Sequence, residues 1–219
     1  MSVPCPPFPA RRLAVVAAVA LWLAAAGTGF GLLEAYKAVP GDAAAAPPSW
    51  PAGSQVRPDP GRASLLLFCH PHCPCTRASL DELEAVLTRC GGRASARVLF
   101  VVPEEGPRDW EHTDLWRCAA GLPGVVVRAD AGGREARRFS ASTSGHALLY
   151  GPDGRLLYHG GLTGSRGHAG DNPRRAAVLA LLRGAAAGPL EGPTFGCSLF
   201  DSSFPRPESE PACCPQPRP

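Results

Sequence analysis

The sequence predicts an α/β fold, in which helices flank a central mixed β-sheet and an N-terminal transmembrane helix precedes the domain. From residue 63 onward, short apolar runs alternate with segments whose apolar residues recur at helical spacing. This alternation is typical of parallel strands joined by helices. A strand–turn–strand pattern then adds an antiparallel hairpin, so the sheet is expected to be mixed. Near the N-terminus, the uncharged segment 13–33 is long enough to cross a bilayer.

The predicted strands are short apolar runs, and the predicted helices show apolar residues at three- and four-residue spacings. The run Ser64–Phe68 is continuous, as expected for a strand that is covered on both faces. Downstream, Gly151–Gly154 reads Gly-Pro-Asp-Gly, which is the composition of a tight turn. The predicted strands are 64–68, 98–102, 125–127, 147–150 and 155–159, and the predicted helices are 78–90, 109–119 and 173–182.

The N-terminal segment predicts that the domain is exported. Arg11 and Arg12 precede about 21 apolar residues, or roughly 31 Å of helix, and positive charge before a span keeps the N-terminus in the cytoplasm. A cleaved signal peptide is the alternative, since Ala43–Ala45 offers small residues for cleavage. The predicted segments are a cytoplasmic N-terminus (1–12), the anchor or signal peptide (13–33), a Pro/Ala-rich tether (34–62), the α/β domain (63–185), a docked extension (186–203) and a disordered tail (204–219).

Length, charge and cysteine content limit the classes of function. A chain of 219 residues can hold one well-filled core with extensions. The net charge of +3 comes from arginines that are spread along the chain without aromatic interleaving, so nucleic-acid binding is not expected. All nine cysteines except Cys5 follow the apolar segment, and export would carry them to an oxidising space where disulfides persist.

The most informative motif is Cys-His-Pro-His-Cys-Pro-Cys at residues 69–75, between the first predicted strand and its helix. Thiols and imidazoles attack disulfides or bind soft and borderline metals. Core packing gives no reason to gather five of them in one short segment. The expected chemistry is therefore thiol redox exchange, metal binding or both.

For redox chemistry, Cys73 is the best-placed nucleophile. It precedes Pro74 at the expected helix start, where free backbone N–H groups and the helix dipole stabilise a thiolate and lower its pKa. A protonated His72 would lower that pKa further. Cys75 or Cys69 would be the resolving thiol, and no cofactor is required. A Cys-x-Cys pair closes only a small, strained ring, which favours oxidising or isomerising chemistry.

With the motif between a buried strand and an amphipathic helix, and a Pro-Asp-Gly turn downstream, residues 60–185 resemble the thioredoxin-like superfamily, especially its membrane-anchored bacterial branch (TlpA/ResA-like). The resemblance implies a thioredoxin-like fold and thiol–disulfide oxidoreductase activity on protein thiols or disulfides. It also implies a single-pass protein of the bacterial inner membrane whose domain faces the periplasm. The chain departs from the family in having Cys-x-Cys at the helix start and in placing Gly145 at or near the position of the family's cis-proline.

A second resemblance implies a different activity. Cys69 and Cys73 form a Cys-x-x-x-Cys motif followed by proline, which is similar to the copper-binding motif of Sco-type proteins, and His146 lies near the position of their distal histidine ligand. The alternative function is therefore a copper-binding protein or metallochaperone that serves a copper enzyme. Its candidate metal ligands are Cys69, Cys73, Cys75, His72 and His146. A non-catalytic thioredoxin-like scaffold is the third hypothesis.

Two later segments contain candidate accessory residues. A glycine-rich loop at 160–172 contains Arg166 and His168, and it is expected to be either a solvated loop or a binding or gating loop. Cys197 lies in the last apolar patch of the chain. It is expected either to pair with another thiol such as Cys118, which would fix the docked extension, or to join the active cysteines.

Overall fold

The computed structural model describes residues 10–42, 44–104, 109–185 and 190–200, and the chain divides into two compact units, residues 1–38 and 39–219. The predicted tail at 204–219 lies outside the described residues. So do residues 1–9 of the predicted cytoplasmic N-terminus and parts of the predicted docked extension.

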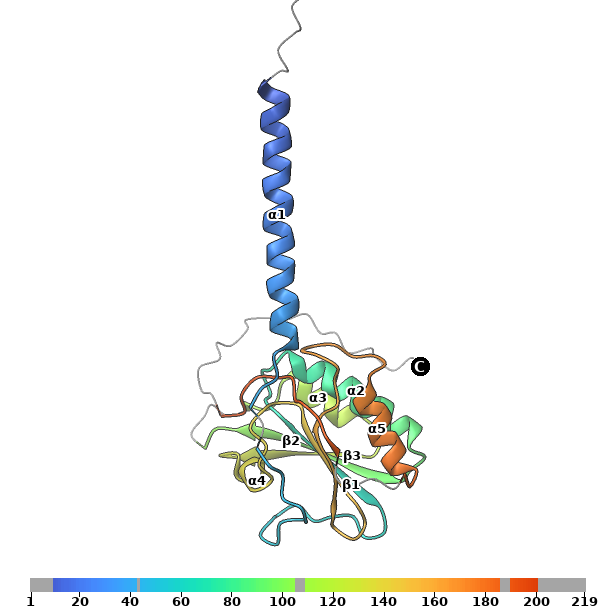
Figure 1. Ribbon diagram of the computed structural model, residues 1–219. Coiled ribbons are helices and arrows are strands. Elements are labelled where there is room, and N and C mark those ends of the chain that lie inside the picture. Colours follow the sequence, from blue (N-terminus) through green and yellow to red (C-terminus); the bar gives the residue numbers. More distant parts are fainter. Residues whose placement is uncertain (1–9, 43, 105–108, 186–189, 201–219) are drawn as a thin grey trace, which may run out of the picture. The chain divides into compact units, whose positions relative to one another are not determined.

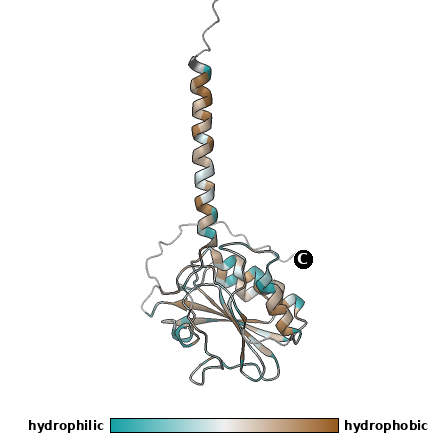
Figure 2. Ribbon diagram, viewed as in Figure 1, coloured by the Kyte–Doolittle hydropathy of each residue, from teal (hydrophilic) through white to brown (hydrophobic). Residues whose placement is uncertain are grey.

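The first unit contains helix α1 (Ala10–Ala38) (Figure 1). From Arg12 onward, this helix is long and apolar enough to cross a membrane, and it is the one such helix within the described ranges. Apolar side chains such as Leu13, Trp22 and Phe30 are exposed, and hydrophobic colour follows most of the helix in Figure 2. A helix that is apolar all round is suited to lipid rather than water. Length and composition therefore fit a membrane anchor or a signal sequence.

The second unit is built on a six-stranded sheet with the strand order β3-β2-β1-β4-β5-β6. Its strands are β1 (Ala63–Cys69), β2 (Ala94–Val102), β3 (Val125–Ala131), β4 (His146–Tyr150), β5 (Leu156–Gly161) and β6 (Leu190–Glu191), and its helices are α2 (Cys75–Arg89), α3 (Asp114–Gly121), α4 (Arg134–Arg138) and α5 (Pro173–Leu182). The first three strands are parallel, whereas β4 is antiparallel to β1 and β5. The predicted α/β fold with a mixed sheet is confirmed.

Helices pack against both faces of the sheet (Figure 1). Side chains of β1 alternate, so that Leu65, Leu67 and Cys69 face the core beneath α2, α3 and α5, whereas Leu66 and Phe68 face the core beneath α4. Every residue of β1 is buried, as predicted for a strand that is covered on both faces. The central strand therefore ends at Cys69 and delivers the cysteine motif to the carboxyl edge of the parallel strands.

The observed helices differ from the predicted ones mainly at their ends. Helix α2 begins at Cys75, inside the motif, because Pro74 already has helical dihedral angles and occupies the N-cap position. Helix α3 begins at Asp114, where the Thr113 hydroxyl accepts a hydrogen bond from the Trp116 N–H. The short elements α4 and β6 were not predicted, because they have too few residues to show a hydrophobic period.

Part of the predicted tether packs on the domain. The indole of Trp50 lies edge-on to the rings of Phe139 and Tyr150, with centroids 5.2 and 5.1 Å away. Its Nε1–H donates to the carbonyl of Val56 at 3.1 Å, and Val56 is buried. Residues 50–56 of the predicted tether (34–62) therefore pack on the domain, because an aromatic ring that finds apolar partners is more stable buried than in water.

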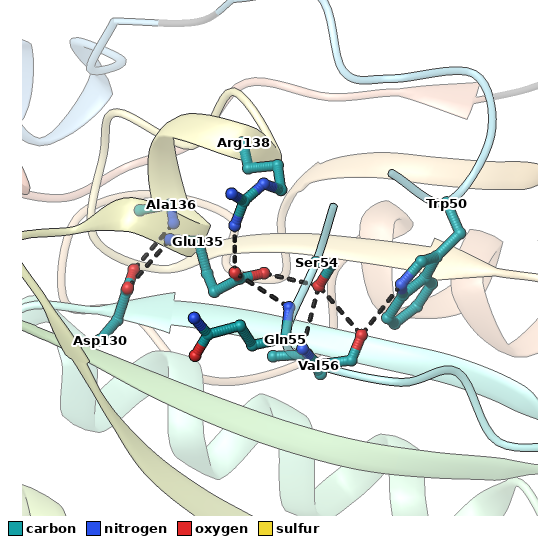
Figure 3. A network of polar contacts seen from close by, with 8 residues as sticks. All are labelled: Trp50, Ser54, Gln55, Val56, Asp130, Glu135, Ala136 and Arg138. Atoms are coloured by element: carbon teal, nitrogen blue, oxygen red, sulfur yellow. Dashed lines mark hydrogen bonds and ion pairs between the residues drawn. The ribbon is translucent and has the colours of Figure 1, made fainter. Parts of the chain in front are cut away.

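The carboxylate of Glu135 attaches the same segment to α4 (Figure 3). It accepts hydrogen bonds from the Ser54 hydroxyl at 2.5 Å and from the Gln55 N–H at 3.2 Å, and it pairs with Arg138. The adjacent Asp130 carboxylate accepts the first free N–H groups of α4 at 2.9 and 2.8 Å. The bonds from Ser54 and Gln55 therefore fix this segment to α4, on the face of the sheet to which Leu66 and Phe68 point.

Candidate functional site

Residues 69–75 form a tight turn between β1 and α2. The N–H of Cys73 donates to the carbonyl of His70 at 3.2 Å, and the N–H of Thr76 donates to the carbonyl of Cys73 at 3.0 Å. Cys73 therefore lies immediately before the N-cap residue Pro74. At this position the N–H of Cys75, the first residue of α2, has no partner within the helix and can bind an anion.

The Cys73 sulfur is the centre of a three-thiol cluster that consists of Cys73, Cys75 and Cys197. The thiols of Cys197 and Cys75 donate hydrogen bonds to this sulfur, and so do the backbone N–H groups of the same two residues. These bonds lower the pKa of Cys73, although burial of the residue, which is 1% exposed, acts in the opposite direction. The direction is the predicted one, but the largest cause is the neighbouring thiols.

Cys75 and Cys197 act as donors, and both are partly exposed. Contact with the Cys73 sulfur is the main reason why the pKa of Cys197 is raised, since loss of its proton would break the hydrogen bond and place two negative charges together. For Cys75, the Cys197 thiol lowers the pKa, but the contact with Cys73 and burial outweigh it, so the pKa is raised. The three sulfurs therefore share one negative charge, which is centred on Cys73.

Cys69 has a different environment from the three-thiol cluster. It is fully buried in the core beneath α2. Burial raises its pKa, the nearby charge of Cys73 raises it further, and hydrogen bonds from the Gly145 N–H and the Thr76 hydroxyl oppose this only in part. Because the thiolate is the nucleophile in disulfide exchange, a buried neutral thiol is poorly suited to it. The geometry favours Cys75 over Cys69 as a partner of Cys73.

Cys197 reaches the cluster on the C-terminal strap, which we define as residues 190–200. The strap begins as β6, paired in parallel with β5, and then crosses the loop that precedes β4. There the N–H of Ser144 donates to the carbonyl of Cys197 at 2.8 Å. A Cβ atom on Gly196 would lie 1.9 Å from the Ser144 carbonyl oxygen, so the two backbones are in direct contact. Contacts on both sides therefore fix the position of Cys197.

Two buried hydroxyls that the sequence analysis did not identify support the motif turn. The Ser144 hydroxyl accepts from the N–H of His70 at 2.9 Å and lies 2.9 Å from the Thr76 hydroxyl. Beside it, Gly145 has a φ of 89°, and a Cβ atom there would lie 2.7 Å from the Ser79 hydroxyl. Both the positive φ and the close Ser79 hydroxyl therefore favour glycine over any other residue at position 145. A single serine or threonine leaves no periodic signal in a sequence, which is why both hydroxyls were missed.

The two histidines of the motif have different surroundings. His70 is buried, and burial lowers its pKa, although the negative charge of Cys73 acts in the opposite direction. His72 packs its ring 4.3 Å from that of Trp110, and its Nε2–H donates to the Trp110 carbonyl at 3.2 Å. The structure places the buried His70 within electrostatic reach of Cys73, because the chain leaves the alternating strand geometry after Cys69.

His146 lies on the opposite face of the sheet from Cys69. It is in register with Phe68, whose side chain faces the core beneath α4. Burial is the main reason why the pKa of His146 is lowered to about 4, and His159, with its ring centroid 6.2 Å away, adds to the effect. Neither ring nitrogen of His146 has a hydrogen-bond partner among the described residues.

The metal ligands proposed from the sequence are not brought together. Cys69 and His146 face opposite sides of the sheet, and Cys73 contacts Cys75 and Cys197 instead. Within the described ranges, no group of three or more His, Cys, Asp or Glu side chains has the arrangement of a metal site. The residues present therefore do not fit a copper ion held by Cys69, Cys73 and His146.

Of the accessory candidates, Arg166 and Cys197 join the site. The Arg166 guanidinium donates to the carbonyls of Gly196 and Val39, and its charge favours the thiolate form of Cys75. The glycine-rich loop is therefore attached to the strap at this point. His168 is exposed. Cys118 is disulfide-bonded whereas Cys197 is a free thiol, so the suggested pairing of Cys118 with Cys197 is wrong.

The strand order, the flanking helices and a cysteine motif between the central strand and its helix define a thioredoxin-like fold. No protein-family model matches the chain, and no curated protein does so either. Solved structures do match. A hypothetical protein from Sinorhizobium meliloti aligns with a TM-score of 0.58 and 20% identity, over 74% of this chain and 98% of that one.

Two further solved structures extend this comparison. An uncharacterized conserved protein from Geobacillus kaustophilus aligns with a TM-score of 0.54 and 22% identity, over 78% of this chain and 94% of that one. The exposed lipoprotein thioredoxin Etrx1 from Streptococcus pneumoniae aligns with a TM-score of 0.42 and 16% identity, over 57% of this chain and 85% of that one. At these identities the likeness concerns the fold, and the activity has to be argued from the site.

Proposed function

We propose that this chain is a membrane-anchored, extracytoplasmic thiol–disulfide oxidoreductase of the TlpA/ResA-like type that acts on the thiols or disulfides of other proteins. The observation that carries the proposal is the Cys73 sulfur, which lies at the start of α2 and accepts hydrogen bonds from two other thiols. A stabilised thiolate and a neighbouring thiol can form a disulfide, and this change releases the two electrons that thiol–disulfide exchange transfers.

The roles of the cysteines follow from their environments. Cys73 is the thiolate of the site, acting as nucleophile on a substrate disulfide or as leaving group from a protein disulfide. Cys75, which is in hydrogen-bonding contact with it, is the second thiol of the motif. Cys73 is 1% exposed whereas Cys75 is partly exposed, so a substrate meets the outer sulfurs of the cluster first.

The proposed location rests on the N-terminal segment. Helix α1 is long and apolar enough to span a membrane, and the paired arginines before its apolar stretch favour a cytoplasmic N-terminus. That orientation places the cysteine motif on the extracytoplasmic side, the periplasm of a bacterial cell, where disulfides persist.

The test uses the full chain in detergent micelles, with two readouts: reactivation of scrambled ribonuclease, and oxidation of a dithiol peptide with oxidised glutathione as the final oxidant. We expect turnover in the wild type and a fall to the uncatalysed rate in Cys73→Ser. Cys90→Ala is the matched control, because Cys90 is equally buried but lies at the other end of α2. Equal turnover in Cys73→Ser and the wild type would rule out the proposed function.

A further inference from the structure

The C-terminal strap supplies a third thiol to the site from a part of the chain that the motif does not include. We infer that Cys197 is the redox partner of Cys73: the two close a disulfide between the strap and the motif turn, and Cys197 presents the outer sulfur of that disulfide to the thiols of a substrate protein. The inference rests on the proposed function, because it assigns the disulfide through which the exchange takes place.

Contact with Cys73 is the first argument for this pair. Ser144 joins the strap to the motif turn, because its N–H donates to the Cys197 carbonyl at 2.8 Å while its hydroxyl accepts from the His70 N–H at 2.9 Å. Within this contact, the thiol and the backbone N–H of Cys197 donate to the Cys73 sulfur, so the two sulfurs are neighbours in the reduced protein. Both cysteines are free thiols in this structure. Closing the disulfide replaces an S–H···S hydrogen bond by a covalent bond without bringing distant parts of the chain together.

Comparison with Cys75 is the second argument. Cys73 and Cys75 are separated by one residue, and a Cys-x-Cys pair can close only a small, strained ring. Cys75 is also the first residue of α2, so its backbone is fixed by the helix. Cys197 comes from a distant part of the sequence, and no short ring limits its bond to Cys73. The cluster therefore offers Cys73 one strained partner and one unconstrained partner.

The fixed position of the strap is the third argument. Two backbone hydrogen bonds of 2.8 Å hold the strap at and just after Cys197, from the Ser144 N–H to the Cys197 carbonyl and from the Leu199 N–H to the Ser142 carbonyl. Arg166 donates to the carbonyl of Gly196, directly before Cys197. Because the backbone around Cys197 is fixed by these contacts, its thiol is held in place to react with Cys73. Because Cys197 is partly exposed while Cys73 is buried, it is also the member of the pair that a substrate can reach.

The substrate dithiol is oxidised in two exchange steps. A substrate thiolate attacks the Cys197 sulfur, the bond from Cys197 to Cys73 breaks, and Cys73 leaves with the electron pair as a thiolate. The second substrate thiol, once deprotonated, attacks the substrate sulfur of the mixed disulfide and releases Cys197. The substrate dithiol is thereby oxidised to a disulfide and the protein disulfide is reduced by two electrons. One proton ends on Cys197 and the other is released, because Cys73 remains a thiolate.

Reoxidation of Cys73 and Cys197 consumes a disulfide of another molecule, which is reduced to two thiols. Oxidised glutathione serves this purpose in the test. The full chain in detergent micelles is equilibrated with oxidised glutathione, its free thiols are alkylated, and the unreduced digest is mapped by mass spectrometry. We expect a Cys73–Cys197 cross-linked peptide in the wild type, and we expect the same cross-link to persist in Cys75→Ser.

The rate measurement is the single-turnover oxidation of a dithiol peptide by the oxidised protein. We expect Cys197→Ser to slow it by about tenfold or more, since the Cys73–Cys197 disulfide, whose partly exposed Cys197 sulfur receives the substrate thiolate, can no longer form. Gly196→Ala keeps every thiol but moves the strap, because the new Cβ atom cannot lie 1.9 Å from the Ser144 carbonyl oxygen. It is expected to slow formation of the cross-link. Ser198→Ala, a neighbouring strap variant that keeps both contacts of Cys197, is the control and should match the wild type.

The outcomes separate the two proposals. If the cross-link joins Cys73 to Cys75 and Cys197→Ser oxidises the peptide as fast as the wild type, the role of Cys197 is refuted while the oxidoreductase function stands. If Cys73→Ser and the wild type turn over alike, the function itself fails. A wild-type rate in Gly196→Ala, with the domain folded by circular dichroism, would also contradict the inferred role of the strap.

Discussion

His146 gives the domain a stability that depends on pH. Its pKa is lowered to about 4 by burial and by His159, against an ordinary value of 6.5. Between these two values the unfolded chain binds a proton at this side chain and the folded chain does not. The free energy of unfolding is therefore highest above pH 6.5 and falls as the pH is lowered toward 4. At about 1.4 kcal/mol for each pH unit, the full loss is about 3 kcal/mol.

The variant His146→Leu removes this dependence. Leucine has a similar size, and no hydrogen bond is lost, because neither ring nitrogen has a partner among the described residues. Urea unfolding of the full chain in detergent micelles, followed by tryptophan fluorescence at pH 7.5 and pH 5, measures the difference. Between these pH values the wild type should lose about 2 kcal/mol more than His146→Leu. The exposed His168→Leu should behave like the wild type.

Equal losses of stability in the wild type and in His146→Leu would refute this reasoning. The same variant also bears on the metal hypothesis. Because His146 and Cys69 face opposite sides of the sheet, oxidation of the dithiol peptide should continue unchanged in His146→Leu. A loss of turnover at a preserved stability would show that the histidine acts on the cysteines after all.

Three further outcomes test other parts of the structure. Trp50→Ala should lower the free energy of unfolding by about 2–3 kcal/mol in urea, because it removes a ring that packs on two aromatic side chains, whereas Trp50→Phe should cost less. Glu82→Ala should cost about 1.5–3 kcal/mol in the same assay, since it removes the 2.9 Å charged hydrogen bond between Arg175 and the fully buried Glu82, while Arg175 keeps its ion pair with Asp171. Leu23→Arg should disfavour insertion of α1 by about 2.5–3.5 kcal/mol, which is measured as the fraction of the chain that remains in membranes after alkaline extraction.

The order of the fold could be predicted from the sequence because its central elements carry strong local signals. Ser64–Phe68 is apolar throughout, and the Gly-Pro-Asp-Gly turn fixes the hairpin of β4 and β5. Packing of Trp50 could not be predicted in the same way. A proline-rich segment has no hydrophobic period, and the partners of Trp50, Phe139 and Tyr150, lie far along the chain.

In the candidate site, too, residues with local signals could be predicted and residues placed by long-range contacts could not. Cys73 and Cys75 could be predicted because their chemistry depends on a local feature, the start of a helix directly after a buried strand. The side chain of His146 could not be placed, because the choice of sheet face follows from register and a shift of one residue reverses it. Proximity of Cys197 to Cys73 depends on a strap whose backbone hydrogen bonds join parts of the chain that are far apart in sequence, and such bonds leave no pattern in a sequence.

The environment of Cys73 also bears on the direction of electron flow in the proposed activity. Hydrogen bonds to a charged group contribute about 1.5–3 kcal/mol each, and here they act only when Cys73 is a thiolate, that is, in the reduced protein. A stabilised reduced form makes the disulfide a stronger oxidant, by about 30 mV for every 1.4 kcal/mol in a two-electron couple. Burial of Cys73 opposes this effect but does not cancel it, since its pKa remains lowered. Because its thiolate is stabilised, Cys73 is a better leaving group than an ordinary cysteine. The three-thiol cluster therefore favours oxidation of a substrate dithiol over reduction of a substrate disulfide.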